Sequence, residues 1–450
     1  MVDAKWLKKQ AEKVRKADAI DPALYLRYGV KRGLRNDNGT GVLVGLTTIG
    51  NVHGYVMSEG EKQPVPGELY YRGINVRDIV AADKREHRFG YEETAYLLLF
   101  GALPRARELV DWKRKIGSYR KLSENFRDTA IMSNPSKELM NALARAILFA
   151  YAFDPDDSPD DISLEKCLEQ SVDLIGSIPT IVAYAYQAKA HYHDGHSLMI
   201  RNPDPRLSTA ENFLMLTRED GRYTKLEAET LDLALIIHAE HGGGNNSSFI
   251  THVVTSAHSD IYSSVAASVL SLKGSRHGGA NLRVMRQMDE LKASVRDWTN
   301  REQVARYLGR IADRKAGDRS GLIYGLGHAV YTLSDPRAQL LKEKARLLAR
   351  EKGREKEMRL LELVEECGPE IIRARHRHAD TICANVDLYS GFVYDMLGIP
   401  RELYTPLFAV ARCVSWCAHR MEELVNEGPI IRPAYKPIFR PCDYVPLSNR

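Results

Sequence analysis

Apolar residues recur every three to four positions along most of this chain, and this helical period constrains the fold more than any other feature. The period takes over at Tyr91 and is clearest in residues 404–426, where the apolar positions are Leu407, Val410, Ala411, Val414 and Ala418. Further helices are expected over residues 3–17, 164–190, 223–241 and, after Pro336, 338–366. Because strand signals are few after residue 75, we expect a mainly α fold.

A few segments depart from the helical period. Gly41–Gly50 is rich in β-branched residues and bounded by glycines, so a strand or two is expected there. Tyr70–Gly73 follows a Pro-Gly turn, and the helix that opens at Tyr91 is expected to end near Gly101–Pro104. The acidic run Asp154–Asp161 lacks the glycine and the terminal glutamate of an EF-hand loop, and its prolines predict an exposed linker.

Length and charge narrow the classes of protein that fit. At 450 residues the chain exceeds the usual size of one domain, which predicts two. The net charge of +5 does not indicate nucleic acid or a membrane surface as a partner, and no apolar run reaches the roughly 20 residues of a transmembrane helix. The basic N-terminal residues are interspersed with acids, unlike a transit peptide. Six cysteines without a Cys-x-x-Cys pair favour reduced thiols in a cytoplasm.

Histidines stand beside glycines at three places, each at the edge of a helical run: His238-Ala-Glu-His241 before three glycines, His277-Gly-Gly, and Gly-Leu-Gly-His328. Glycine lets a backbone approach a ligand closely, and histidine can donate, accept or move a proton near neutral pH. The pattern indicates a site. For the first pair, which shares a helix face, a structural or solvated role is the alternative. A zincin needs histidines four apart with glutamate directly after the first, and this spacing is three, so no metal is expected.

Two charged residues stand in apolar surroundings. Asp387, between Val386 and Leu388, is expected to be partly desolvated, which favours its neutral form and makes it a stronger base when ionised; an N-cap or surface aspartate is the alternative. Arg412 lies inside the apolar 404–426 segment and must pair with an anion, either a ligand or a protein carboxylate. His277 precedes a helix expected from Leu282 onward, and a helix N-terminus keeps an imidazole neutral and able to donate.

Several common chemistries are not supported by the sequence. It has no Gly-x-Ser-x-Gly elbow of a serine hydrolase and no Gly-x-x-x-x-Gly-Lys-[Ser/Thr] phosphate loop. No Gly-x-Gly-x-x-Gly follows a strand, so a Rossmann cofactor site is not expected.

Taken in order, the motifs resemble those of citrate synthase. The matching segments are His238-x-x-His241, His277-Gly-Gly-Ala-Asn281, Gly327-His328-Ala-Val-Tyr331, Asp335-Pro-Arg337, Asn385-Val-Asp387-x-Tyr-Ser-Gly391 and Phe408-Ala-Val-Ala-Arg412-x-x-x-Trp416-x-x-His419. Leu69–Gly73 and Ile431–Pro433 extend the resemblance to nearly the whole chain. Any one of these motifs is weak, but the ordered set is specific.

The resemblance implies a two-domain helical homodimer, with a large domain over 1–279 and 397–450 and a smaller mobile domain over 280–396. It implies a transferase of the tricarboxylic acid cycle that condenses oxaloacetate with acetyl-CoA to give citrate and CoA. Asp387 would take a methyl proton, His277 would hydrogen-bond the thioester oxygen, and His328 would polarise the ketone. The residues implied to hold oxaloacetate are His241, Arg337, Arg412 and, from the other subunit, Arg432. No metal or redox cofactor is needed.

Two departures from the family pattern leave part of the site open. Gly242 stands where many members have glutamate, and Thr332-Leu333-Ser334 stands where many have a basic residue, so the contacts to the CoA phosphates are not assigned. A 2-methylcitrate synthase, which would use propionyl-CoA, shares these motifs and is an alternative. A metal-dependent hydrolase using His238 and His241 is an alternative of another class.

Overall fold

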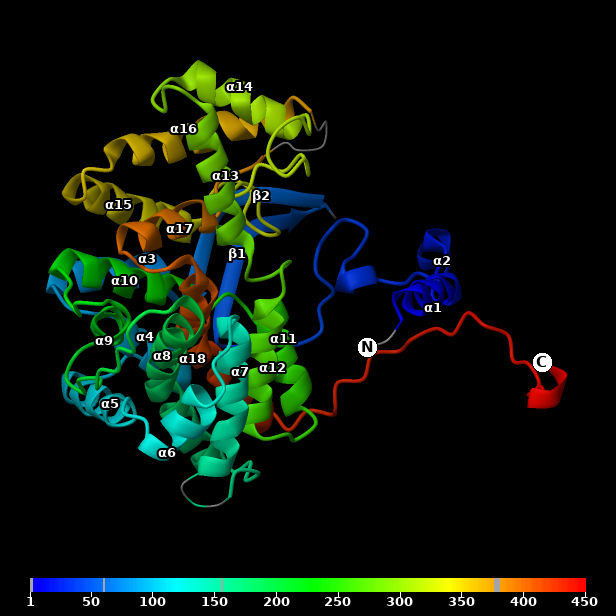
Figure 1. Ribbon diagram of the computed structural model, residues 1–450, viewed down its shortest axis with the longest axis horizontal. Helices are drawn as coiled ribbons and strands as arrows, with labels where there is room; N and C mark the ends of the chain where they lie inside the picture. The colour runs from blue at the N-terminus through cyan, green and yellow to red at the C-terminus, as the bar shows by residue number, and fades with distance from the viewer. Residues whose placement is uncertain (1–2, 60, 155, 157, 376–380) are drawn as a thin grey trace. The chain divides into compact units, whose positions relative to one another are not determined.

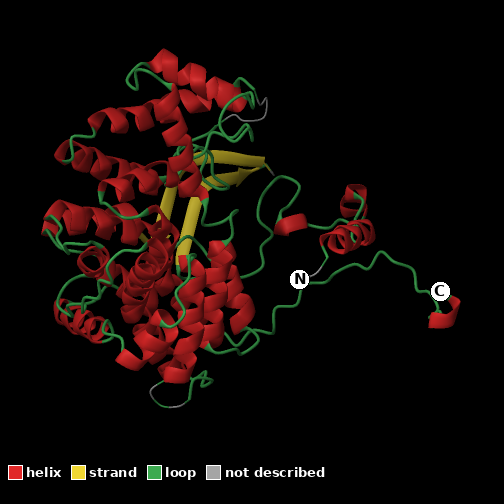
Figure 2. Cartoon of the chain, viewed as in Figure 1, coloured by secondary structure: helices red, strands yellow, loops and turns green. Residues whose placement is uncertain are grey.

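The computed structural model describes residues 3–59, 61–154, 156, 158–375 and 381–450. Helices dominate it, which confirms the mainly α fold, and Figure 2 shows how little of the chain forms strands. Among the described residues, no helix is both long enough and apolar enough to cross a membrane.

The chain separates into two compact units. The smaller comprises Met1–Leu46 and Met57–Glu61 and holds helices α1 (Ala4–Ala17) and α2 (Pro22–Arg27). Asp3 caps α1 by accepting a hydrogen bond from the Lys5 amide, so the helix predicted over 3–17 is confirmed. The larger unit comprises Thr47–Val56 and Lys62–Arg450 and holds all the candidate site residues.

The predicted strand over Gly41–Gly50 is wrong, because the first strand starts where that segment ends. The three-stranded sheet runs β1 (Gly50–Ser58), β2 (Glu61–Tyr71) and β3 (Ile74–Asn75) in that order, with Tyr71 opposite Ile74 in an antiparallel pair. Leu43 and Leu46 are almost fully exposed, so their segment has no apolar surface to pack a strand against. The predicted Pro-Gly turn is also wrong, since Gly67 lies inside β2 and its amide donates to Ser334 Oγ at 3.0 Å.

The larger unit is built from helices in two contacting groups (Figure 1). In one group the long helix α18 packs against α4, α8, α10, α11 and α12. In the other, α14 packs on α16, and α17 packs on α13 and α15. The helices of this unit are α3 (Val76–Glu86), α4 (Tyr91–Phe100), α5 (Ala106–Ser118), α6 (Glu124–Phe126), α7 (Leu139–Ala150), α8 (Leu164–Asp194), α9 (Thr209–Thr217), α10 (Lys225–His238), α11 (Asn246–Thr255), α12 (Ile261–Lys273), α13 (Ala280–Ser294), α14 (Arg301–Ala312), α15 (Pro336–Glu351), α16 (Glu355–Arg373), α17 (Asp387–Met396) and α18 (Tyr404–Val425).

Two further predictions need correction. The single helix predicted over 338–366 is two helices, α15 and α16, because Gly353 adopts a left-handed φ of 64° that ends the first. The predicted exposed linker Asp154–Asp161 is anchored at its start, since the Asp154 carboxylate is buried and binds Lys166 Nζ at 2.9 Å and Gln170 Nε2 at 2.8 Å. Pro155 and Asp157 of that segment lie outside the described residues.

Candidate functional site

Arg412 is a fully buried cation with two unused donors. It lies in α18, and its Nε donates to the backbone carbonyl of His238 at 2.7 Å. Nη1 and Nη2 have no hydrogen-bond partner among the described residues. Burial lowers the pKa of Arg412 to about 10, with Glu240 opposing this shift, so the guanidinium remains charged at neutral pH. A buried charge with free donors is costly unless an anion binds to it.

His238 and His241 present two more unused nitrogens beside this cation. Thr224 and Glu227 form a capping box that fixes the start of α10, and the helix ends at His238. His238 Nδ1 and His241 Nε2 are buried without a partner in the described chain. Burial, reinforced by Arg337, lowers the pKa of both imidazoles well below 6.5, so both are neutral.

His328 is held with one nitrogen committed and the other free to donate. Its Nδ1 accepts hydrogen bonds from the amides of Val330 at 3.1 Å and Tyr331 at 3.0 Å. Burial and the charge of Arg337 lower its pKa to about 4. A neutral ring that accepts at Nδ1 must carry its proton at Nε2. The His328 ring stands edge-on to that of His241, with 5.2 Å between centroids, and so belongs to the same cluster.

Arg337 differs from Arg412 because it already has an anionic partner. Asp335 caps α15, and Pro336 occupies its first turn, which places Arg337 at the buried end of the helix. Arg337 Nε and Nη2 bind the two oxygens of Asp335 at 3.1 Å and 2.8 Å. Asp335 raises the pKa of Arg337 although burial opposes it. The guanidinium lies 5.7 Å from the centroid of the Tyr331 ring, within the cluster.

Asp387 opens α17 and is tied by the backbone to the His328 loop. The Asn385 amide donates to the Gly325 carbonyl at 2.9 Å, and Asn385 Nδ2 donates to the Gly327 carbonyl, also at 2.9 Å. Gly325 has a φ of 87°, and a Cβ there would lie 2.9 Å from Leu388 Cδ1, so only glycine permits this approach. Burial raises the pKa of Asp387 to about 6, with Arg337 opposing. The desolvation predicted for this carboxylate is therefore confirmed.

His277 lies in the loop between α12 and α13. Helix α13 begins at Ala280, two residues before its predicted start. His277 Nε2 is 3.3 Å from Ser247 Oγ, which also accepts from Trp416 Nε1 at 3.2 Å. Burial, aided by Arg412, lowers the pKa of His277 to about 4, so the predicted neutral imidazole is confirmed.

Arg432 is the one predicted site residue that lies apart from the others. It is exposed in the irregular segment after α18, where the Ile431 amide donates to Ser256 Oγ at 3.1 Å. It shares no hydrogen bond or ion pair with the other site residues within the described chain. Its assignment to the site of a second subunit stays a prediction.

The sequence analysis missed the role of Glu240, between the two histidines of the first motif. Its carboxylate is fully buried, accepts from the Gly242 amide and Ser415 Oγ, and lies 3.2 Å from His419 Nε2. Burial alone would raise the pKa of Glu240, but His419 and Arg412 lower it to about 2. The available signal in the sequence was a single acidic residue at the end of an apolar helix. It did not reveal the partners of Glu240, because these lie some 175 residues away in α18.

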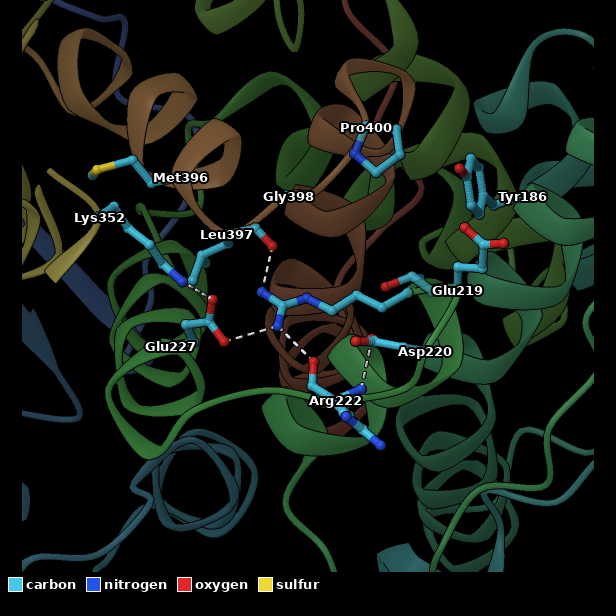
Figure 3. A pocket seen from close by; sticks show the side chains of 12 residues that line it. Tyr186, Glu219, Asp220, Arg222, Glu227, Lys352, Met396, Leu397, Gly398 and Pro400 are labelled. Carbon is cyan, nitrogen blue, oxygen red and sulfur yellow. Dashed lines mark hydrogen bonds and ion pairs between the residues drawn. The ribbon is translucent and has the colours of Figure 1, made fainter. Parts of the chain in front are cut away.

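Two surface hollows of the larger unit differ in their distance from the predicted site residues. The larger, of about 730 Å³, is lined by residues that include Arg218, Glu227 and Lys352, and none of the predicted site residues lines it (Figure 3). Two of its cations share one carboxylate, since Glu227 binds Lys352 Nζ at 2.6 Å and Arg218 Nη1 at 2.8 Å. Among the described residues that line it, none is a buried cation with unpartnered donors like Arg412.

The smaller hollow, of about 370 Å³, adjoins the His277 loop. Ser275 and Gly279 of that loop line it, and its basic side chains are Lys137, Lys273, Arg283 and Arg286. Lys273 is paired with Glu138 at 3.4 Å, whereas Arg286 is exposed to solvent. This hollow can therefore receive an anionic group close to His277.

The sequence of this chain is similar to those of known proteins. The family model described as "Citrate synthase, C-terminal domain" matches residues 38–434. The citrate synthase of Haloferax volcanii is 34% identical over 85% of this chain and 93% of its own length. The 2-methylcitrate synthase 1 of Corynebacterium glutamicum is 32% identical over 86% of this chain and 93% of its own.

A solved structure extends the likeness to the fold. The citrate synthase of Thermoplasma acidophilum, in a ternary complex with carboxymethyl coenzyme A and oxaloacetate, superposes with a TM-score of 0.75 at 27% identity, over 94% of this chain and 99% of the other. None of these comparisons supports the metal-dependent hydrolase. Among the described residues, no third ligand completes a metal site with His238 and His241.

Proposed function

Since this chain belongs to the citrate synthase family of acyltransferases, we propose that it condenses oxaloacetate with acetyl-CoA and water to give citrate and free CoA. The observation that carries the proposal is the set of unused buried nitrogens at Arg412, His238 and His241. Oxaloacetate brings two carboxylates and a ketone, which are acceptors for the free donors of Arg412 and for an imidazole nitrogen that carries its proton. The bound oxaloacetate of the Thermoplasma acidophilum complex supports the same ligand class.

We assign one carboxylate of oxaloacetate to the free Nη1 and Nη2 of Arg412. A planar guanidinium grips a carboxylate at two points, and a buried site strengthens that contact. Arg337 uses Nε and Nη2 to bind Asp335, so its Nη1 would donate to oxaloacetate. Its charge would also keep the cluster positive. His241 Nε2 faces the same ligand.

The proton on His328 Nε2 is placed to polarise the ketone. Two backbone amides hold Nδ1, so the ring cannot switch tautomer without losing both hydrogen bonds. A preorganised donor of this kind stabilises the alkoxide as charge develops on the ketone oxygen. Because the pKa of His328 is low, the imidazole that would donate to the ketone oxygen is neutral near pH 7.

Asp387 and His277 would act together on the thioester. A thioester α-proton is weakly acidic, so a carboxylate needs a partner that stabilises the developing enolate oxygen. A desolvated carboxylate with a pKa of about 6 is a stronger base than an exposed one and is still ionised at pH 7. Neutral His277 would donate to the oxygen while Asp387 removes the methyl proton. Carbon attack on the ketone and hydrolysis of the resulting thioester then release CoA.

The basic hollow beside His277 supports a place for the CoA phosphates. A phosphate in that hollow would lie near Arg283 and Arg286, and the thioester could reach the His277 loop. In this chain, Arg283 and Arg286 would take over the contact to the CoA phosphates from the basic residue that many family members have near Thr332. No metal or redox cofactor takes part in the proposed reaction, and the free state of all six cysteines supports a cytoplasmic location.

The domain division and the dimer are also part of the proposal. We infer that residues 280–396 form a smaller domain that closes over 1–279 and 397–450 and excludes water during condensation. Arg432 of the partner subunit would complete each site. The extended, exposed segment that carries Arg432 supports this exchange, since it can reach over a neighbouring chain.

The choice between an acetyl and a propionyl group as the acyl substrate is the finer part of the proposal. Both citrate synthases and 2-methylcitrate synthases are among the relatives, and one methylene is worth only about 1–3 kcal/mol in a pocket. CoA-thiol release should be measured with acetyl-CoA and propionyl-CoA at equal concentration, with and without oxaloacetate. We expect oxaloacetate-dependent release, faster with acetyl-CoA. Faster release with propionyl-CoA would make the chain a 2-methylcitrate synthase, and release that ignores oxaloacetate would overturn the condensation itself.

A further inference from the structure

A second cluster of imidazoles and carboxylates lies where α11 packs on α18, next to Glu240. His252 comes from α11, and His419 and Glu422 come from α18. His252 Nε2 lies 3.1 Å from His419 Nδ1, and His419 Nδ1 lies 3.8 Å from Glu422 Oε2. The three atoms are all within 4.8 Å of one another. The proposed reaction uses none of these side chains.

Carboxylates fix the outer nitrogen of each imidazole as a donor. His252 Nδ1 lies 2.7 Å from Glu423 Oε2, and His419 Nε2 lies 3.2 Å from Glu240 Oε2. An ionised carboxylate only accepts, so each ring must carry a proton on that outer nitrogen. Although burial opposes it, Glu240 and Glu422 raise the pKa of His419 to about 9, so without a metal its Nδ1 carries a proton that His252 Nε2 accepts. When that proton leaves, His252 Nε2 and His419 Nδ1 are two lone pairs that face each other.

Glu422 adds a third lone pair at the same point. Its Oε1 accepts from the Thr48 amide at 2.7 Å and from Thr48 Oγ1 at 2.9 Å. Its Oε2 is buried and has no hydrogen-bond partner in the described chain. Arg72 lies near enough for its charge to act on Glu422, but it donates to Thr48 and to the Leu98 carbonyl instead. Three acceptors therefore converge here once His419 Nδ1 has released its proton.

Either that proton or a metal ion stands at this point, and a metal ion can bind all three atoms at once. One shared proton can join the two nitrogens but leaves Glu422 Oε2 unpaired at 3.8 Å. Tetrahedral zinc with ligands at about 2.0–2.1 Å separates its ligand atoms by about 3.3 Å. The observed 3.1 Å and 3.8 Å lie on either side of that spacing. A carboxylate behind each ligating imidazole is the arrangement by which proteins orient metal-binding histidines.

We propose that this chain binds one divalent transition-metal ion of the zinc class through His252 Nε2, His419 Nδ1 and Glu422 Oε2, with water completing the coordination. Two imidazoles and one carboxylate are a donor set suited to Zn²⁺. The ion joins α11 to α18 and, through His419, orients Glu240 beside the cluster of His238 and His241. It contacts none of the residues assigned to substrate, so the site stands independently of the proposed reaction.

The test uses the full-length protein without a histidine tag, stripped with a chelator and then titrated with Zn²⁺ against a chromophoric chelator. We expect one equivalent per chain at submicromolar affinity and a higher melting temperature with the ion bound. His252→Gln should weaken binding at least a hundredfold. His193→Gln, which removes an exposed histidine on α8, is the matched control and should bind as wild type does.

A second variant keeps the test decisive if His252→Gln does not fold. Glu423→Gln leaves all three ligands and removes only the carboxylate behind His252, so binding should weaken about 10- to 100-fold. Circular dichroism of the stripped proteins checks folding. Wild-type protein that binds no stoichiometric Zn²⁺ would show that the imidazoles share a proton and that there is no metal site. A Glu423→Gln variant that binds Zn²⁺ unchanged would place the ion elsewhere on the chain and overturn this ligand set.

Discussion

At the scale of single residues, we expect oxaloacetate binding to depend most on Arg412. Its charge is buried, and its terminal nitrogens have no partner in the described chain. Arg412→Lys keeps the charge but loses the planar two-point contact, and each charged hydrogen bond is worth about 1.5–3 kcal/mol. We expect oxaloacetate affinity, measured by calorimetry, to fall roughly 10- to 100-fold. The control is Arg359→Lys, which alters a surface ion pair with Glu366 and should bind normally. Equal affinities in the two variants would make Arg412 a structural residue.

Asp387 governs the expected pH dependence. Its pKa is raised to about 6, whereas those of His277 and His328 are lowered to about 4, so of these three residues only Asp387 changes charge just below neutrality. The base must be ionised, so turnover should fall tenfold per pH unit below about pH 6. Asp387→Asn should nearly abolish turnover at every pH and leave oxaloacetate binding largely intact. Turnover that stays flat down to pH 5 would remove Asp387 from the role of base.

Sequence motifs located most of the residues of the cluster but not the state of each. The order of motifs pointed to His241, His328 and Arg412, and the apolar neighbours of Asp387 indicated its desolvation. The pairing of Arg337 with Asp335 could not be predicted, because it depends on side-chain conformations at the start of a helix. Glu240 was missed because its partners come from α18, far along the chain. Residue types and local spacing carry no information about contacts of that range.

At the scale of elements, the loop before α13 must hold His277 against a tightly packed backbone. A Cβ at Gly278 would lie 2.3 Å from the Leu272 carbonyl oxygen and 2.8 Å from Thr405 Cγ2. Gly278→Ala should therefore displace the His277 loop, and a shift of about 1 Å can lower turnover roughly a hundredfold. Oxaloacetate affinity should be unchanged, because His277 is assigned to the thioester.

The control for this prediction is Gly244→Ala. A Cβ at Gly244 would have no atom within 4 Å, so the variant should keep wild-type turnover. Steady-state turnover and calorimetric affinity are measured for both variants. Normal turnover in Gly278→Ala would show that the loop does not need its present position for the reaction.

Strongly periodic helices were predictable from the sequence, and irregular segments were not. The period in residues 404–426 located α18, because a helix buried on all sides needs apolar residues around most of its surface. The helix predicted over 338–366 ignored Gly353, whose left-handed conformation is a property of one residue within a favourable helical pattern. The strand predicted over Gly41–Gly50 failed because β-branched residues form a strand only where a neighbouring strand or a core receives them.

At the scale of the whole molecule, the proposed reaction needs a second copy of the chain to complete each site. His277→Ala and Arg432→Ala should each be nearly inactive alone, because each removes a residue of every site. In a mixed dimer of the two variants, an Arg432 that acts across the interface leaves one site with both lesions and the other with neither. Activity should therefore return when differently tagged variants are co-expressed and the mixed dimer is isolated. A mixed dimer as inactive as its parents would place Arg432 in the site of its own subunit.

The proposed condensation joins the methyl carbon of acetyl-CoA to oxaloacetate, and identifying the product tests it most directly. Acetyl-CoA labelled with ¹³C in its acetyl group is incubated with oxaloacetate, and the products are analysed by mass spectrometry beside free CoA. We predict labelled citrate in equal amount to the CoA released by wild type, and nearly none from Asp387→Asn. Release of CoA with labelled acetate and no labelled citrate would contradict the account and make the protein a thioesterase.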